Sequence, residues 1–265
     1  MITLGWFSTG RGEGSQGLLQ AALDAIRRGE LDARILFVFC NREPGEHEGS
    51  DRFQRLVREG DIPLVSLSSR RFARQQGKPL SQVRLEYDRE VMRRLAPYAP
   101  DLCVLAGYML ITGPELCRRY PMLNLHPALP GGPAGTWQEV IWQLMAARAS
   151  ESGVMVHLVT EEVDQGPPIT YCSFPIQEEP FDPHWRELQK RSVEEVKGQG
   201  GEEHPLFRLI RQEQMRRERP LMVETLKAFT QGRLRVSRGQ VVDAHGKPVP
   251  TLCLNEEVER ALHAS

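Results

Sequence analysis

The N-terminal part of the chain alternates between short apolar segments and longer amphipathic ones, and this alternation constrains the fold more than any other feature. The apolar segments are nearly continuous, as strands are when helices cover both faces of a parallel sheet. The pattern predicts strands at residues 2–7, 34–40, 64–67 and 101–106, and helices at 18–28, 51–59 and 81–95. We therefore expect an α/β protein with a mostly parallel sheet.

The pattern changes after Pro130. We expect a helix at 136–147, strands at 154–160 and 169–174, a charged helix at 182–198, a helix at 205–229 that Pro220 interrupts, and a hairpin from 234–236 and 241–242. No linker is long enough to separate two domains. We expect residues 1–180 to form the α/β core and residues 181–265 to add a C-terminal helical and hairpin extension to the same domain.

Composition excludes several classes of protein. The 34 basic and 35 acidic residues balance, which argues against nucleic-acid or anionic-membrane partners. The basic runs at Arg70-Arg71 and 216–219 are typical of solvated helix surfaces. No apolar run approaches the ~20 residues of a membrane helix, and the start lacks the features of a signal peptide. The five scattered cysteines predict a reduced, cytoplasmic protein without a metal site.

Polar motifs follow several predicted strands. Right-handed crossovers place the carboxyl ends of parallel strands on one edge of the sheet, where open α/β sheets hold their ligands. The glycine-rich loop 9–17, the segment 108–112 and Asn124-Leu125-His126 all fall on that edge. We therefore expect a binding site there.

The glycine-rich loop resembles a phosphate cradle, because exposed backbone N–H groups and a helix N-terminus favour anions. Its spacing matches neither the dinucleotide fingerprint nor a Walker A loop. A monophosphate or other small anion at Gly14, Ser15 and Gln16 and a plain tight turn both remain open.

Asn124, His126 and Asp164 together suggest acyl-type transfer. In a strand, residues i and i+2 share a face, so Asn124 and His126 emerge side by side, while Asp164 lies in the turn sequence 163–168. Such a trio supplies a hydrogen-bond donor for an oxyanion, a group that gains or loses a proton, and a carboxylate that favours imidazolium. Taken singly, His126 reads as a strand-terminal histidine and Asp164 as a turn residue.

The segments 106–111, 123–127 and 156–167 resemble the formyltetrahydrofolate-dependent N-formyltransferases, most closely those that act on phosphoribosylglycinamide. The resemblance implies a Rossmann-like sheet with helices on both faces, the formyltransferase fold. It also implies transfer of a formyl group from the cosubstrate 10-formyltetrahydrofolate, without a metal, to a primary amine in purine biosynthesis. The acceptor would be a phosphate-bearing small molecule, and the protein a monomer or homodimer.

The resemblance assigns roles to particular residues. Asn124 and His126 would stabilise the oxyanion, and Asp164 would hold His126 charged and help to move the amine proton. The folate side would be formed by Arg84, Met109, Leu110, Ile111, Thr112, Thr160, Glu161, Glu162 and Val163. The amine substrate would contact Gly14, Ser15, Gln16 and Gln212.

The chain departs from the family pattern in the regions that would contact the amine substrate. The loop 128–137 is shorter and lacks the usual polar side chain, the first glycine loop is longer, and the stretch 182–203 is extended. Alternatives are therefore formylation of another amine, such as an amino-sugar nucleotide, and formyltetrahydrofolate deformylase. Deformylases carry an N-terminal regulatory module, whereas this chain starts at its first strand. A non-catalytic folate or nucleotide binder is a further alternative.

Overall fold

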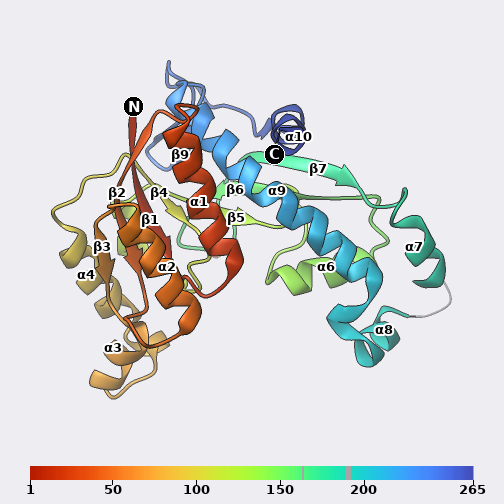
Figure 1. Cartoon of the computed structure of the whole chain (residues 1–265), viewed down its shortest axis with the longest axis horizontal. Helices are drawn as coiled ribbons and strands as arrows, with labels where there is room; N and C mark the ends of the chain where they lie inside the picture. The colour runs from red at the N-terminus through yellow and green to blue at the C-terminus, as the bar shows by residue number, and fades with distance from the viewer. Residues whose placement is uncertain (163, 189–191, 265) are drawn as a thin grey trace. The chain divides into compact units, whose positions relative to one another are not determined.

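The computed structural model describes residues 1–162, 164–188 and 192–264, which group into two compact units. Unit 1 comprises Met1–Asn124, Leu158–Pro167 and Leu226–Val249, and unit 2 comprises Leu125–His157, Pro168–Thr225 and Pro250–Ser265. Figure 1 colours the chain by residue number. The predicted boundary at residue 180 stays a prediction.

Eight strands follow one another in the hydrogen-bonded order β10-β7-β6-β5-β4-β1-β2-β3. Unit 1 holds the parallel strands β1 (Ile2–Ser8), β2 (Ala33–Cys40), β3 (Leu64–Ser66) and β4 (Leu102–Leu105). Strand β5 (Met122–His126) pairs in parallel with β4 and runs from unit 1 into unit 2. The predicted mostly parallel α/β sheet is thereby confirmed.

Helices surround the strands of unit 1 (Figure 1). They are α1 (Glu13–Arg27), α2 (Glu48–Glu59), α3 (Ser69–Gln75), the 3-10 helix η1 (Leu80–Gln82), α4 (Arg84–Leu95) and α5 (Pro114–Arg119). Alternate residues of the strands, among them Phe7, Phe37 and Phe39, pack against α4 and α5 in one aromatic core. Successive side chains of a strand point to opposite faces of the sheet, so each strand can pack against helices on both faces. Near the chain's end β8 (Arg235–Ser237) and β9 (Gln240–Val242) form the predicted hairpin.

Helix α1 corrects the predicted extent of the glycine loop. It begins at Glu13, five residues before the expected start, with Gly12 as its extended N-cap residue. The acidic Glu13 suits the positive end of a helix dipole, and the Ser15 hydroxyl donates to the Gly12 carbonyl at 2.8 Å. Tertiary packing overrides the low helix propensity of glycine here. Helices α3 and α5 were not expected from the sequence.

Unit 2 contains β6 (Glu151–Leu158), β7 (Pro168–Pro175) and β10 (Leu252–Cys253), except that the last residue of β6 belongs to unit 1. Strand β7 pairs antiparallel with β6 and parallel with β10. Its helices are α6 (Trp137–Ala146), α7 (Asp182–Leu188), α8 (Val193–Gln199), η2 (Gly201–Glu203), α9 (Pro205–Thr230, whose last residues belong to unit 1) and α10 (Asn255–His263). The single helix expected at 182–198 is wrong: Ser192 and Glu195 form a capping box that starts α8. Helix α9 continues through Pro220, because burial of Leu221 and Met222 outweighs the penalty of proline.

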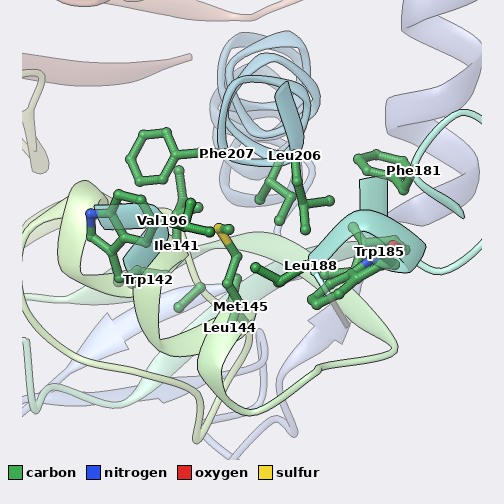
Figure 2. Close-up of a cluster of buried hydrophobic side chains, with 14 of the residues drawn as sticks. Ile141, Trp142, Leu144, Met145, Phe181, Trp185, Leu188, Val196, Leu206 and Phe207 are labelled. Atoms are coloured by element: carbon green, nitrogen blue, oxygen red, sulfur yellow. Dashed lines mark hydrogen bonds between the residues drawn. The ribbon is translucent and has the colours of Figure 1, made fainter. Parts of the chain in front are cut away.

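Figure 2 shows the apolar core of unit 2, in which side chains from α6, α7, α8 and α9 converge. The Trp142 and Phe207 rings pack with centroids 4.7 Å apart. The Trp185 indole N–H donates to the Ile176 carbonyl. The extended segment that follows residue 181 thus helps to build this core. No described helix is both long and apolar enough to cross a membrane.

Candidate functional site

Strand β5 positions Asn124 and His126. Asn124 is half-buried opposite Leu105 of β4, and His126, at the end of the strand, is only 4% exposed. The Nε2 atom of His126 lies 2.9 Å from the carbonyl oxygen of Pro133. A carbonyl only accepts hydrogen bonds, so Nε2 carries the proton and donates it. The imidazole is therefore a donor at the atom that faces the loop.

Loop 128–136 is folded so that its backbone reaches His126. Gly131 and Gly135 have φ of 76° and 110°, which glycine adopts without strain. Thr136 then begins α6 in a capping box with Glu139. Although the loop lacks the polar side chain that the resemblance implies, it supplies a carbonyl oxygen in contact with His126.

Helix α9 fixes the backbone after His126 through Gln214, which is fully buried. Its Nε2 donates to the Pro127 carbonyl at 2.8 Å and to Ser152 Oγ at 3.2 Å. Gln212, the residue expected to bind the amine substrate, is exposed, and its role stays a prediction. Helical period marks Gln214 as inward-facing, because buried Ile210 lies four residues earlier.

A second imidazole lies beside His126 in unit 2. The ring of buried His157, on β6, packs edge-on against His126 with centroids 6.4 Å apart and an interplanar angle of 86°. Edge-to-face geometry is a favoured arrangement of ring pairs. The His126 ring thus contacts a neighbouring ring as well as the Pro133 carbonyl.

The loop that carries Asp164 belongs to unit 1 and is anchored beside β5. The Val159 N–H donates to the Met122 carbonyl at 2.8 Å, and the Leu158 N–H to the Pro167 carbonyl at 3.0 Å. Asp164 is half-buried and has φ of 55°, a conformation that Asp tolerates better than most residues. Unit 1 therefore holds the segments of Asn124 and Asp164 side by side. Val163 lies outside the described residues.

In segment 107–113 some apolar side chains are exposed to solvent and others pack against the core. Met109 and Ile111 are 73% and 63% exposed, whereas Leu110 packs against the aromatic core. Thr112 is buried, and its Oγ1 accepts from the Cys117 thiol at 3.2 Å. Two neighbouring exposed apolar side chains suit a flat apolar ligand better than water. The assignment of 109–112 to a pterin pocket stays a prediction.

Arg84 is not free on the surface, because it pairs with Asp88 at 3.0 Å. The two groups are close but lack the alignment of a hydrogen bond, and Arg84 Nη2 is buried without a partner. Burial raises the pKa of Asp88, and Arg84 opposes that rise. Asp88 Oδ2 also accepts from the Gly113 N–H at 2.7 Å. The pair thereby ties α4 to the end of segment 107–113.

The predicted folate residues after β6 contact α5. The Cys117 Sγ lies 3.5 Å from the Thr160 carbonyl, and Arg118 pairs with Glu161 at 2.9 Å. Glu162 is exposed, and its carbonyl accepts from the Thr160 hydroxyl at 3.1 Å. Because Cys117 also contacts Thr112, the structure brings segments 107–113 and 160–162 together.

The predicted anion cradle forms the first turn of α1. Ser15 is buried, and the Gln16 amide donates to the Gly49 carbonyl at 3.2 Å. A Cβ on Gly107 would lie 2.9 Å from Ser15 Cβ, and the Met109 N–H donates to Thr9 Oγ1 at 2.9 Å. The cradle at Gly14–Gln16 therefore adjoins the segment predicted to bind folate. Among the described residues, no group of His, Cys, Asp and Glu is arranged to hold a metal ion.

Comparison with known proteins identifies relatives for most of the chain. The family model described as "Formyl transferase" matches residues 11–194. A phosphoribosylglycinamide formyltransferase from Haemophilus influenzae is 30% identical over 237 residues, 88% of this chain and 90% of that protein. The Escherichia coli (strain K12) protein of the same name is 31% identical over 167 residues, covering 62% of this chain and 70% of its own length. The crystal structure of glycinamide ribonucleotide transformylase 1 from Symbiobacterium toebii aligns with a TM-score of 0.62 and 25% identity, covering 92% of this chain and 94% of that one.

Proposed function

Because the chain belongs to the formyl transferase family, we propose that it transfers a formyl group from 10-formyltetrahydrofolate to the primary amine of phosphoribosylglycinamide. The observation that carries this proposal is the protonated Nε2 of His126 at the end of β5, 2.9 Å from a carbonyl oxygen. An oxygen that gains negative charge in the reaction needs such a donor. The formyl oxygen would replace the Pro133 carbonyl at Nε2.

The proposed reaction has two bond changes. The substrate amine forms a C–N bond with the formyl carbon, and the formyl oxygen becomes an oxyanion that accepts from the Asn124 amide and His126 Nε2. The bond from the formyl carbon to N10 of the folate then breaks. The amine loses its proton through water to Asp164, and N10 gains one. Each oxyanion donor is worth roughly 3–4 kcal/mol in such sites.

The binding residues would divide between the two ligands. Exposed Met109 and Ile111 offer an apolar surface for the pterin. Segment 160–162 lies close to segment 107–113, because the Cys117 thiol contacts both Thr112 and the Thr160 carbonyl. The first turn of α1 offers backbone N–H groups to the substrate phosphate, since its N-cap makes no side-chain hydrogen bond. Segments 9–16 and 107–109 adjoin, so both ligands would be held next to each other.

The test is incubation of the purified protein with 10-formyltetrahydrofolate and a panel of amines, with products identified by mass spectrometry. Formylated phosphoribosylglycinamide is expected. Formylation of an amino-sugar nucleotide alone would show that this nucleotide, and not phosphoribosylglycinamide, is the acceptor. Formate release without any amine would identify a deformylase. Folate binding without turnover on any amine would refute catalysis. Asp164→Asn should lower turnover far more than folate affinity, and equal losses would contradict the role of Asp164.

A further inference from the structure

A cavity lined by two arginines lies beyond the ends of β2 and β3, in unit 1. A cavity of about 580 Å³ is lined by Glu46, Ser69, Arg70, Ala73, Arg74 and Leu80. We call this cavity the α3 pocket, because four of these residues lie in α3. Its volume falls within the range of small-molecule sites. The carboxyl ends of parallel strands are also where open α/β sheets bind ligands.

Positive charge exceeds negative charge in the lining of the α3 pocket. Arg70 and Arg74 lie one turn apart on α3, and buried Arg42 lies behind Ser69 with its Nη1 2.9 Å from Ser69 Oγ. Among the described residues, no carboxylate pairs with any of these three guanidinium groups. Burial lowers the pKa of Arg42, the charge of Arg70 lowers it further, and the Glu46 carboxylate opposes this lowering. Exposed Arg70 and Arg74 stand at i and i+4 on α3, a spacing at which like charges are mildly destabilising.

The one carboxylate in the lining is already engaged. Glu46 Oε1 accepts from the Ser68 hydroxyl at 2.5 Å, and Oε2 accepts from the Glu43 N–H at 2.8 Å. Glu43 in turn pairs with Arg71. Glu46 thus orders the wall of the α3 pocket and leaves the pocket with an excess of positive charge.

Ser69 adds a donor to the lining. Its Oγ accepts from Arg42 Nη1 at 2.9 Å and from Asn41 Nδ2 at 3.4 Å. Both bonds use the oxygen as acceptor, so the hydroxyl proton remains available to a ligand. Guanidinium groups match phosphate oxygens with paired hydrogen bonds, and Ala73 and Leu80 offer an apolar wall.

We propose that the α3 pocket binds the phosphate group of a small metabolite, with Arg70, Arg74 and the Ser69 hydroxyl donating to the phosphate oxygens. The site is distinct from the first turn of α1, which the proposed formyl transfer assigns to the substrate phosphate. An anion in the α3 pocket relieves the repulsion among its guanidinium groups, so binding also stabilises the fold.

The test compares the full-length protein with two double variants that lose the same positive charge. Arg70→Gln/Arg74→Gln alters the α3 pocket. Arg27→Gln/Arg28→Gln is the matched control, because both arginines are exposed and pair with carboxylates elsewhere. Calorimetry and thermal unfolding are measured with inorganic phosphate and with ribose 5-phosphate, and with succinate at matched ionic strength.

Wild type and the control should bind both phosphates, and the pocket variant should bind them at least about tenfold more weakly, as expected for lost charged hydrogen bonds. Each phosphate should raise the unfolding temperature of the wild type more than succinate does. Equal phosphate affinity in both double variants would overturn the proposal, as would equal effects of phosphate and succinate. The first turn of α1 is unchanged in all three proteins, so phosphate bound there contributes equally to each. The difference between the two double variants therefore reports the α3 pocket alone, whether or not the proposed formyl transfer is correct.

Discussion

Gly166→Ala tests whether the Asp164 loop must be held in place for catalysis. A Cβ on Gly166 would lie 1.6 Å from the Leu158 carbonyl oxygen, whereas real Cβ contacts are essentially never shorter than 3.0 Å. The loop and β6 must therefore separate by at least 1.4 Å, the difference between these distances. A misplacement of about 1 Å at a catalytic group costs on the order of 10²-fold in rate. We expect turnover to fall about 100-fold, equivalent to ~2.7 kcal/mol of activation free energy.

The assay measures formylated product at saturating folate and amine, with circular dichroism to verify folding. Gly198→Ala is the matched control, because a Cβ there meets nothing within 4 Å and the residue lies in α8. Alanine should leave turnover unchanged and stabilise that helix by roughly 0.5–1 kcal/mol. A folded Gly166→Ala protein with wild-type turnover would refute the claim that the loop's position limits the reaction.

Three further substitutions test contacts around the site. Asp88→Asn should cost roughly 3 kcal/mol of unfolding free energy, because it leaves the Arg84 guanidinium without its carboxylate; Arg84→Met added to it should recover most of that loss in urea denaturation. Gln214→Ala should cost about 1–3 kcal/mol, since the buried Pro127 carbonyl loses its donor, whereas exposed Gln212→Ala should change stability by less than ~0.5 kcal/mol. Trp185→Phe should cost about 1–3 kcal/mol in the same assay by removing the N–H that bonds to Ile176; no change would deny α7 a part in the core of unit 2.

Periodicity predicted the elements that are buried on a regular face. The continuous apolar strands β1, β2 and β4 were found close to their expected limits, because hydrophobic runs report burial directly. Helices α3 and α5 are short and polar on much of their surface, so they carry no such signal. The start of α1 was misplaced because glycine-rich sequence favours loops locally, whereas in the folded protein the first turn of the helix packs with Ser15 beside Gly107.

Motif spacing identified candidate side chains but not the backbone groups around them. Asn124 and His126 stand out because they share a strand face, and that relation is local. The Pro133 carbonyl has no sequence signature, since every residue carries one. It reaches His126 in a loop that contains Gly131 and Gly135 at positive φ. The loop 128–137 looked like a loss of a polar group, yet it contributes an acceptor.

The contact between His126 and Pro133 also bears on how His126 would stabilise the oxyanion. The His126 N–H already donates to a backbone carbonyl. When a substrate oxygen replaces that carbonyl, the free energy gained is only the difference between the two hydrogen bonds. A neutral formyl oxygen resembles that carbonyl closely, so the exchange is nearly balanced in the ground state. An oxyanion is a much stronger acceptor, so the exchange becomes favourable as charge develops. The Pro133 carbonyl would therefore make His126 discriminate in favour of the transition state, which is the condition under which a binding interaction raises turnover.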